Sequence, residues 1–296
     1  MYTQQTSNVA KTYLLMGLFL VVIAGLGYFV SSYYGNPGIF YIAIIFSLFM
    51  NVASFWWSDK IVLGISKARP ANRAEFFDLY TVTENLSISA GLPMPKIYVI
   101  DDSAPNAFAT GWDKNHAVVC VTTGLLQKLD RTELEGVIAH ELSHIGNRDI
   151  LLMSAVVVLV GFVSIISDMF LRGFMFKGGG GDNDNNKAGG VLAILGIILI
   201  VLSPIIATLI KMAISRRREY LADASGALLT RYPEGLAKAL EKIFAYNQPM
   251  KVASNATAHL FISNPFSGKK ISGIANLFQT HPPIAERIKI LRGMIN

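Results

Sequence analysis

The chain has 296 residues, of which 52% are hydrophobic and only 16% are charged, and its formal net charge is +6. Soluble globular domains carry about 25% charged residues, so this composition excludes a wholly soluble protein and predicts that part of the chain lies in a lipid bilayer. The positive charge does not indicate a nucleic-acid partner, because no recognition motif accompanies it and basic residues beside membrane spans account for much of it.

Four apolar runs approach the length of about 20 residues that a helix needs to cross the hydrocarbon core. The first is expected to be a retained anchor rather than a signal peptide, because no cleavage site follows it. The third is the shortest, since Asp168 and Arg172 limit it, and it could instead be a hairpin that inserts only partly. The four runs cover residues 12–30, 39–57, 151–167 and 191–210.

The distribution of Lys and Arg predicts how these spans are oriented. The connection between the first two spans, residues 33–38, carries no charge, whereas basic residues follow the second and fourth spans. Both large polar segments and both termini are therefore expected to be cytoplasmic. The basic residues are Lys60, Lys67, Arg69, Arg73, Lys211, Arg216, Arg217 and Arg218.

The segment after the second span predicts a helix followed by short strands. Apolar residues recur at helical spacing over residues 72–90, up to the breaker GLPMP. Strand patterns over residues 96–101, 106–110 and 116–122 are separated by turn-rich sequence and predict a small antiparallel sheet. The single cysteine, Cys120, lies in the last strand and is expected to be a buried small hydrophobe rather than a nucleophile.

Two more helices are expected after the sheet. A helix-forming stretch covers residues 124–129. Thr132 then stands three residues before Glu135, which is the spacing of a capping box that begins a helix. The fold class predicted is therefore α+β, mainly helical, with about four transmembrane helices.

That last helix carries the stretch VIAHELSHIGNRD, residues 137–149. His140 and His144 share one helix face, so their imidazoles can converge on one ion with Glu141 beside them. Zinc binds imidazole nitrogen readily, and a catalytic zinc site needs three protein ligands and an open position for water. Because this short motif arises by chance in roughly one chain in 150, a third ligand is needed to support it.

The stretch SRRREYLADASGA, residues 215–227, offers that ligand. Glu219 and Asp223 are again four apart, which lets Glu219 bind the metal while Asp223 orients a ligand histidine. Taken alone, the stretch reads as a solvated helix face. His144 and Glu219 lie roughly 10–14 Å beyond the third and fourth spans, so the zinc is expected just above one face of the bilayer.

Other polar features predict no second site. The glycine-rich residues 176–190 read as a flexible linker, since their aspartates lack the spacing of a calcium loop. Residues 247–279 show no periodicity and are expected to be a mobile lid or partly disordered. His116 and His259 have no partner at ligand spacing and are expected not to bind metal.

Four motifs together, in this order, resemble the HtpX-type membrane zinc endopeptidases, which belong to the wider clan that contains the prenyl-protein protease Ste24. The resemblance covers nearly the whole chain. It implies a membrane-bound zinc metalloendopeptidase with a zincin-like (gluzincin) cytoplasmic domain in a bacterial inner membrane, acting in stress response and protein quality control. The motifs are NAFATG from Asn106, HELSH from His140, SRRREYLAD from Ser215 and HPPIAER from His281.

In that family His140, His144 and Glu219 correspond to the ligands of one Zn²⁺, and Glu141 to the general base. The chemistry follows from these groups: zinc acidifies a water molecule, Glu141 takes its proton, and the hydroxide attacks a carbonyl that the metal polarises. Glu141 can then return the proton to the leaving amine.

The resemblance also implies that His281 and Arg287 lie near the metal and stabilise the tetrahedral oxyanion. The local sequence alone, without the resemblance, predicts that His281 before two prolines lies at a helix entry and that Arg287 lies on the helix surface. Asn106 and Ala107 resemble the family's substrate-facing edge, where an extended peptide would add as a strand, whereas Phe108 reads as a core residue.

We therefore predict four segments. Residues 1–57 form two N-terminal transmembrane helices, 58–150 the first part of the catalytic domain, 151–210 a transmembrane hairpin with its glycine-rich loop, and 211–296 the second part of the catalytic domain. Asp149 follows the metal motif and is expected to cap or brace its helix without a chemical role.

The predicted partners are the bilayer and polypeptide substrates, chiefly membrane or misfolded proteins, and an oligomer is possible. One alternative is a narrower processing protease with a function closer to that of Ste24, for which four spans offer too small a membrane chamber. Another is a transporter or scaffold in which the histidine pair is incidental, but translocation pathways usually require charges inside the spans, and these spans contain almost none.

Overall fold

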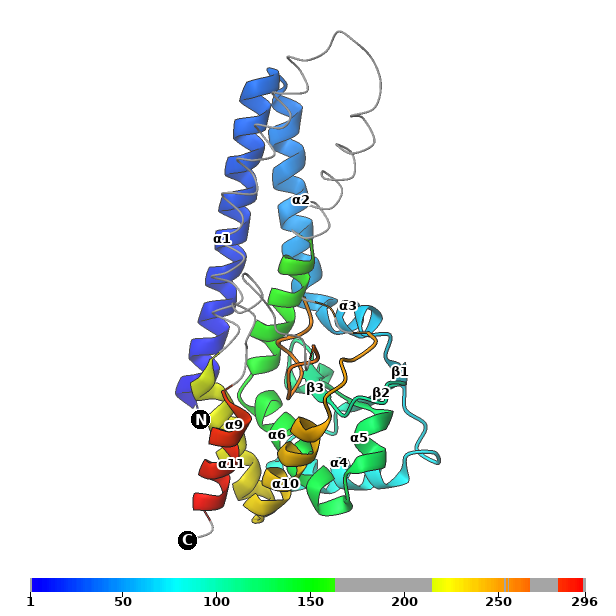
Figure 1. Ribbon diagram of the computed structural model, residues 1–296. Coiled ribbons are helices and arrows are strands. Elements are labelled where there is room, and N and C mark those ends of the chain that lie inside the picture. Colours follow the sequence, from blue (N-terminus) through cyan, green and yellow to red (C-terminus); the bar gives the residue numbers. More distant parts are fainter. Residues whose placement is uncertain (1, 163–214, 253, 255, 267–281, 295–296) are drawn as a thin grey trace.

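The computed structural model describes residues 2–162, 215–252, 254, 256–266 and 282–294 (Figure 1). The fourth predicted span, the glycine-rich loop and His281 lie outside the described residues.

Two long helices stand side by side at the N-terminus, α1 (Tyr2–Tyr34) and α2 (Pro37–Trp56) (Figure 1). Gly35 joins them with a φ of +63°, a left-handed conformation that glycine adopts without strain, and the Asn36 side chain accepts a hydrogen bond from Gly38 N to cap α2. Ile42 and Ile45 are each 67% exposed, as expected of side chains that face lipid. Both helices are long and apolar enough to cross a membrane, and they match the first two predicted spans.

The third predicted span is only partly described. The chain is helical from Asp149 to Phe162, and this helix meets the preceding α6 at 83°. Leu152 and Val156 pack against Leu15 and Phe19 of α1, whereas Val157 belongs to the core under the sheet. The helix therefore lies between α1 and the core under the sheet. Among the described residues, a third span is counted only if the bent pair of helices is taken as one.

The sheet has four strands in the order β1-β2-β4-β3: β1 (Arg69–Pro70), β2 (Lys96–Ile100), β4 (Val118–Thr122) and β3 (Ala107–Thr110). The prediction of an antiparallel sheet is wrong, because β2 and β4 are parallel, although β3 and β4 form an antiparallel pair. The chain passes from β2 to the far edge and returns through β4 into the centre. All five residues of β4 are buried, which is typical of a central strand covered on both faces.

The helices that carry the predicted motifs surround this sheet. They are α6 (Arg131–Gly146), α9 (Arg216–Thr230) and α11 (Ile284–Gly293). The other helices are α3 (Ser58–Ile65), α4 (Phe77–Ala90), α5 (Thr123–Lys128) and α10 (Pro233–Ala245). Helix α4 ends where GLPMP predicts, but it begins at Phe77 rather than near residue 72.

The capping box of α6 is made by a different pair from the one predicted. The Asp130 carboxylate accepts a hydrogen bond from Glu133 N at 3.0 Å, and the Glu133 carboxylate accepts one from Asp130 N at 2.8 Å. Thr132 lies inside the helix and donates its hydroxyl to Asp130. Asp130 and Glu133 have the same three-residue spacing as Thr132 and Glu135, and the pair that comes earlier in the chain caps the helix.

Candidate metal centre

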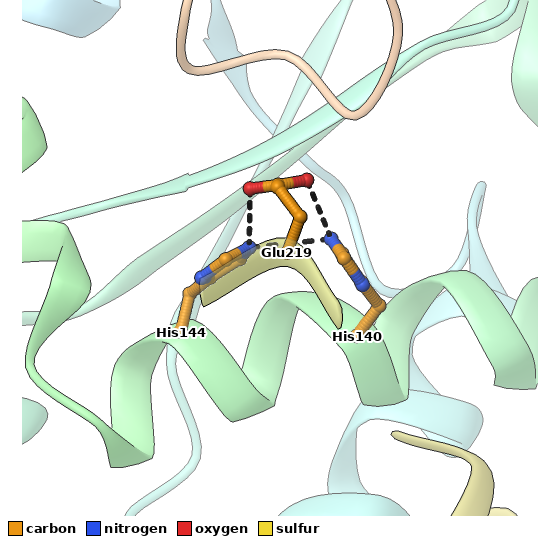
Figure 2. Close-up of side chains that lie close together, drawn as sticks. All are labelled: His140, His144 and Glu219. Carbon is orange, nitrogen blue, oxygen red and sulfur yellow. Dashed lines mark hydrogen bonds and ion pairs between the residues drawn. The ribbon is translucent and has the colours of Figure 1, made fainter. Parts of the chain in front are cut away.

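The HELSH motif lies in the second half of α6, and Glu219 lies in the first turn of α9. His140 and His144 point from successive turns toward Glu219 (Figure 2), and all three residues are buried. The two histidine Nε2 atoms are 3.2 Å apart, and the Glu219 carboxylate oxygens lie 3.9 Å from Nε2 of His140 and 3.6 Å from Nε2 of His144. The structure thus brings together the three residues that the sequence predicts as metal ligands.

The spacing of these atoms suits a tetrahedral zinc ion. Around zinc with bonds of about 2.0–2.1 Å, neighbouring ligand atoms lie roughly 3.3 Å apart. The two histidine nitrogens are 3.2 Å apart, but their contacts of 3.9 and 3.6 Å are made with different oxygens of Glu219, and one ligand atom from each residue gives a set within 4.8 Å. A shift of the Glu219 carboxylate toward the two nitrogens would complete the coordination. Two histidines and a glutamate are a known donor set of catalytic zinc sites, in which the fourth position holds water.

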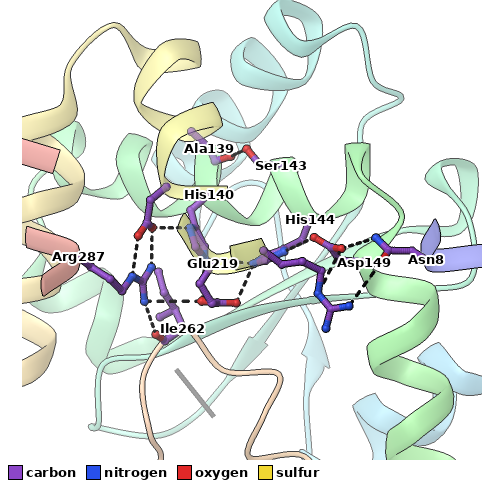
Figure 3. Close-up of polar contacts among 11 residues, drawn as sticks. Asn8, Ala139, His140, Ser143, His144, Asp149, Glu219, Ile262 and Arg287 are labelled. Atoms are coloured by element: carbon purple, nitrogen blue, oxygen red, sulfur yellow. Dashed lines mark hydrogen bonds and ion pairs between the residues drawn. The ribbon is translucent and has the colours of Figure 1, made fainter. Parts of the chain in front are cut away.

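Each imidazole faces a carboxylate through its other nitrogen (Figure 3). Nδ1 of His140 lies 2.9 Å from Asp223 Oδ1, and Nδ1 of His144 lies 2.9 Å from Asp149 Oδ2. Because an ionised carboxylate only accepts, a proton on each Nδ1 suits these contacts and leaves the two Nε2 atoms to face one another. Two lone pairs at 3.2 Å repel one another unless a proton or a cation lies between them, so the donor set fits a metal ion.

The two histidines differ in how readily they hold a proton. Burial lowers the pKa of His140, and the nearby Asp223 offsets this only in part. Burial also lowers the pKa of His144, but the hydrogen bond to Asp149 and the charge of Glu219 outweigh it and raise the pKa to about 9. Since a metal binds neutral imidazole, a proton on His144 competes with the metal below that pH.

Glu141 follows His140 and is buried between α6 and the sheet. Its carboxylate accepts a backbone hydrogen bond from Ala109 in β3. Burial raises the pKa of Glu141 to about 7, even though His144, Arg287 and the Ala109 hydrogen bond act in the opposite direction. A carboxylate with a pKa near the working pH is suited to taking up and returning a proton.

Arg287 is not on the helix surface, as its bare sequence context suggests, because the residue is fully buried. Its guanidinium donates two hydrogen bonds to the Asp223 carboxylate, at 2.8 and 2.7 Å, and one to Ile262 O at 3.1 Å. Nη1 also lies 3.8 Å from Glu219 Oε2. Burial alone would raise the pKa of Asp223, but the Arg287 charge and hydrogen bonds lower it to about 2, so Asp223 faces His140 as a carboxylate.

The predicted substrate edge is covered by a segment of the same chain. Ala107 O accepts a hydrogen bond from Ile262 N at 2.9 Å, and the Asn106 side chain donates to Ser263 O at 2.9 Å. Phe108 packs edge-on against Phe261 in the core, as predicted. Residues 261–263 therefore occupy the outer side of β3, an arrangement that the irregular sequence of this region does not indicate.

The other two described histidines lie elsewhere. His116 pairs with Asp113 at 2.8 Å on the surface, and Nε2 of His259 contacts Met153 O at 3.2 Å. The sequence predicts for Asp149 only a role in bracing the helix and gives no sign of its contact with His144. Its position five residues after His144 gives no helical signal, because the chain turns between them through Asn147 and Arg148.

A close approach at Gly226 lets α9 carry Glu219 and Asp223 to the histidines. A Cβ atom at this position would lie 3.0 Å from His140 N and 3.2 Å from Ala139 C, both backbone atoms. Gly226→Ala is expected to push α9 from α6 by a few tenths of an ångström, to cost about 1–3 kcal/mol of stability and to weaken zinc binding about tenfold. Chelator competition and thermal unfolding measure the two effects.

Gly64→Ala is the matched control for that variant, because a Cβ at position 64 of α3 would meet nothing within 4 Å. It should bind zinc as the wild type does and be equally or slightly more stable. Equal zinc affinity in Gly226→Ala and wild type would contradict the importance of this close approach.

The sequence matches that of known proteins along almost its full length. The description of the matching family is Peptidase family M48, over residues 73–295. A "Protease HtpX homolog" of Caldanaerobacter subterraneus subsp. tengcongensis is 49% identical over 299 aligned residues, covering 99% of this chain and 98% of the relative. Another, of Thermoanaerobacter pseudethanolicus, is 48% identical, with 99% of this chain and 98% of the relative covered.

The crystal structure of S. mikatae Ste24p has a similar fold, with a TM-score of 0.51 and 20% sequence identity. The similarity covers 97% of this chain but only 64% of the Ste24p chain. At this identity the likeness concerns the fold alone.

Proposed function

The chain belongs to peptidase family M48 and is a membrane-bound metalloprotease, and from this premise we propose that one zinc ion, held by His140, His144 and Glu219, serves an endopeptidase that cuts membrane or misfolded proteins. The observation that carries the proposal is the convergence of these three buried ligand atoms within 4.8 Å, next to the carboxylate of Glu141.

The proposed mechanism assigns each step to a residue of the chain. A zinc ion held by His140, His144 and Glu219 would supply Lewis acidity, lowering the pKa of a water molecule and polarising the peptide carbonyl. Glu141 takes the proton of the attacking water and returns it to the leaving amine. Asp223 and Asp149 hold the two imidazoles in the tautomer that leaves Nε2 free to bind the metal.

Arg287 supports the metal site by holding Asp223 and by placing its own positive charge beside Glu219. Its two hydrogen bonds to Asp223 favour a role in holding the carboxylate that orients His140. The oxyanion role that the family resemblance implies for His281 and Arg287 stays a prediction. It is compatible with the 3.8 Å distance from Arg287 to Glu219, which keeps the guanidinium beside the metal ligands.

We propose that a substrate binds in extended form along β3 at Asn106 and Ala107. Residues 262 and 263 occupy the hydrogen-bonding groups there, so a substrate strand has to replace the contacts of Ile262 and Ser263. Their displacement opens the edge strand that lies next to Glu141.

The membrane arrangement is proposed from the sequence. The positive-inside distribution supports a cytoplasmic catalytic domain in a bacterial inner membrane, built from residues 58–150 and 211–296, with 1–57 and 151–210 in the bilayer. The two described N-terminal helices, α1 and α2, support the placement of residues 1–57 in the bilayer. A transporter or scaffold is not favoured, since the curated relatives are named as proteases over nearly the whole chain.

The proposal predicts zinc-dependent hydrolysis. The full-length protein in lipid nanodiscs should cleave an unfolded protein such as casein, lose the activity on treatment with 1,10-phenanthroline, and regain it with stoichiometric Zn²⁺. Glu219→Gln should bind zinc at least about tenfold more weakly, because one charged ligand is lost. Elemental analysis and gel-based cleavage provide the measurements, and cleavage that resists the chelator would contradict the assignment.

A further inference from the structure

The first turns of α1 reach the segment next to the metal centre. The Asn8 side chain is almost fully buried, and Nδ2 donates hydrogen bonds to Asp149 Oδ1 at 2.6 Å and to Asn147 O at 3.1 Å (Figure 3). Three residues earlier, Gln5 Nε2 donates to Gly146 O at 2.6 Å. The N-terminal end of the anchor helix is thus hydrogen-bonded to the segment that ends α6, about 140 residues later in the chain.

Asp149 connects this contact to the metal ligand. Its Oδ2 accepts the hydrogen bond from His144 Nδ1 at 2.9 Å, while its Oδ1 accepts the one from Asn8. Arg218 completes the group, with Nε 3.6 Å from Asp149 Oδ1 and Nη1 3.5 Å from Asn8 Oδ1. The amide of Asn8 therefore lies between a carboxylate and a guanidinium: it donates to Asp149 and to Asn147 O, and it accepts from Arg218.

Attachment of α1 to the body does not require this amide. Leu15, Phe19 and Ile23 of α1 already pack against the helix Asp149–Phe162 through an apolar cluster. Burying an amide costs free energy unless its hydrogen bonds are made, and an apolar side chain would serve packing equally well. The position of Asn8 is instead explained by the group that it contacts, the carboxylate that orients His144.

We propose that Asn8 is a positioning residue of the metal centre: by fixing Asp149, it holds the His144 imidazole with Nε2 toward the metal, so that the membrane anchor α1 is itself a part of the zinc site. Partners of metal-ligating histidines set both tautomer and ring orientation, and a carboxylate free to rotate does this less well. The proposal rests on the proposed zinc site and adds to it a residue outside the matched family region, which begins at residue 73.

The test measures zinc affinity of the full-length protein in nanodiscs by competition with a chromophoric chelator, independently of catalysis. Asn8→Leu, which keeps the branching of the side chain but has no donors, is expected to weaken zinc binding roughly tenfold, the lower end of the effect of removing a partner of a ligand. Asn8→Ala should show the same loss of zinc affinity. Because alanine is readily accepted in a helix, this variant provides the test if Asn8→Leu folds poorly.

Asn51→Leu is the matched control. Asn51 in α2 is also buried, and its Nδ2 donates to Met16 O of α1 at 3.2 Å, but within the described part of the chain it forms no hydrogen bond with the metal ligands or with Asp149. This variant removes a polar contact of α1 of the same kind and should bind zinc as the wild type does. Equal weakening in both variants would show that loosening of the helix pair, rather than the loss of the Asp149 contact, is responsible, and would overturn the proposal.

A double-mutant cycle shows whether Asn8 acts through Asp149. In the Asp149→Asn background, where the orienting carboxylate is gone, Asn8→Leu should cause no further loss of zinc affinity. Additive losses would overturn the proposed route, and affinity within twofold of the wild type for Asn8→Leu and Asn8→Ala would overturn the role of Asn8. If the wild type itself bound no zinc, the proposed metal site would fail instead, so the two failures are distinguishable.

Discussion

Glu141→Gln is expected to lower the rate of peptide-bond hydrolysis by about 10²–10⁴-fold while the zinc content stays at the wild-type level. Glutamine has the shape of glutamate and can accept the Ala109 hydrogen bond, but it cannot take a proton from water. The Glu141 pKa of about 7 is that of the metal-free protein, and the charge of a bound zinc ion would lower it, so the rate of the zinc-loaded enzyme should rise with pH over an interval that lies below pH 7. Initial cleavage rates against pH, together with elemental analysis, measure both effects.

Glu135→Gln is the matched control on the same helix. Glu135 is half-buried and pairs with Arg131 at 3.4 Å in the first half of α6, five residues before His140. Its loss should change neither rate nor zinc content, because such pairs contribute little. Activity of Glu141→Gln within tenfold of the wild type would remove Glu141 as the base, and a loss of zinc would show that the substitution had disturbed the site rather than the chemistry.

Arg287→Met is expected to destabilise the protein by about 3–5 kcal/mol, because it leaves the Asp223 carboxylate buried without its charged partner. Both residues are at most 1% exposed, and their two hydrogen bonds are 2.7 and 2.8 Å long. Zinc affinity should fall as well, since an unrestrained Asp223 no longer orients His140. Thermal unfolding of the metal-free protein and chelator competition separate these effects.

Two further variants make this prediction specific. Arg292→Met removes an arginine from the same helix that pairs with Glu234 and Glu241 on the surface, so it should cost at most about 1 kcal/mol. Arg287→Met combined with Asp223→Asn removes both buried charges and should recover much of the stability, but not the zinc affinity, because His140 still lacks its carboxylate. Equal destabilisation by Arg287→Met and Arg292→Met would contradict the argument.

The ligands themselves were predictable from sequence because the information is local. His140 and His144 share a helix face by spacing, and His144 and Glu219 each lie within about ten residues of an apolar run. The two N-terminal membrane helices were likewise evident, since composition alone determines their length. Such features depend on one element at a time.

The features that were missed depend on contacts between distant elements. The parallel pairing of β2 and β4 follows from a return of the chain into the centre of the sheet, which alternation of side chains cannot indicate. The burial of Arg287 depends on Asp223, 64 residues earlier. The contact of Asp149 with His144 requires a turn in which Arg148 has a φ of +57°, a conformation that an arginine in the sequence gives no reason to expect.

Only Asn147 and Arg148 separate α6 from the helix Asp149–Phe162, and the two helices meet nearly at a right angle, at 83°. The second helix packs against α1, which is long and apolar enough to cross a membrane. With only two residues at the bend, α6 has little freedom to move along the axis of α1. We therefore expect a fixed distance between the metal centre and the bilayer, so that the length of chain between a substrate's membrane boundary and its scissile bond selects which bonds are cut.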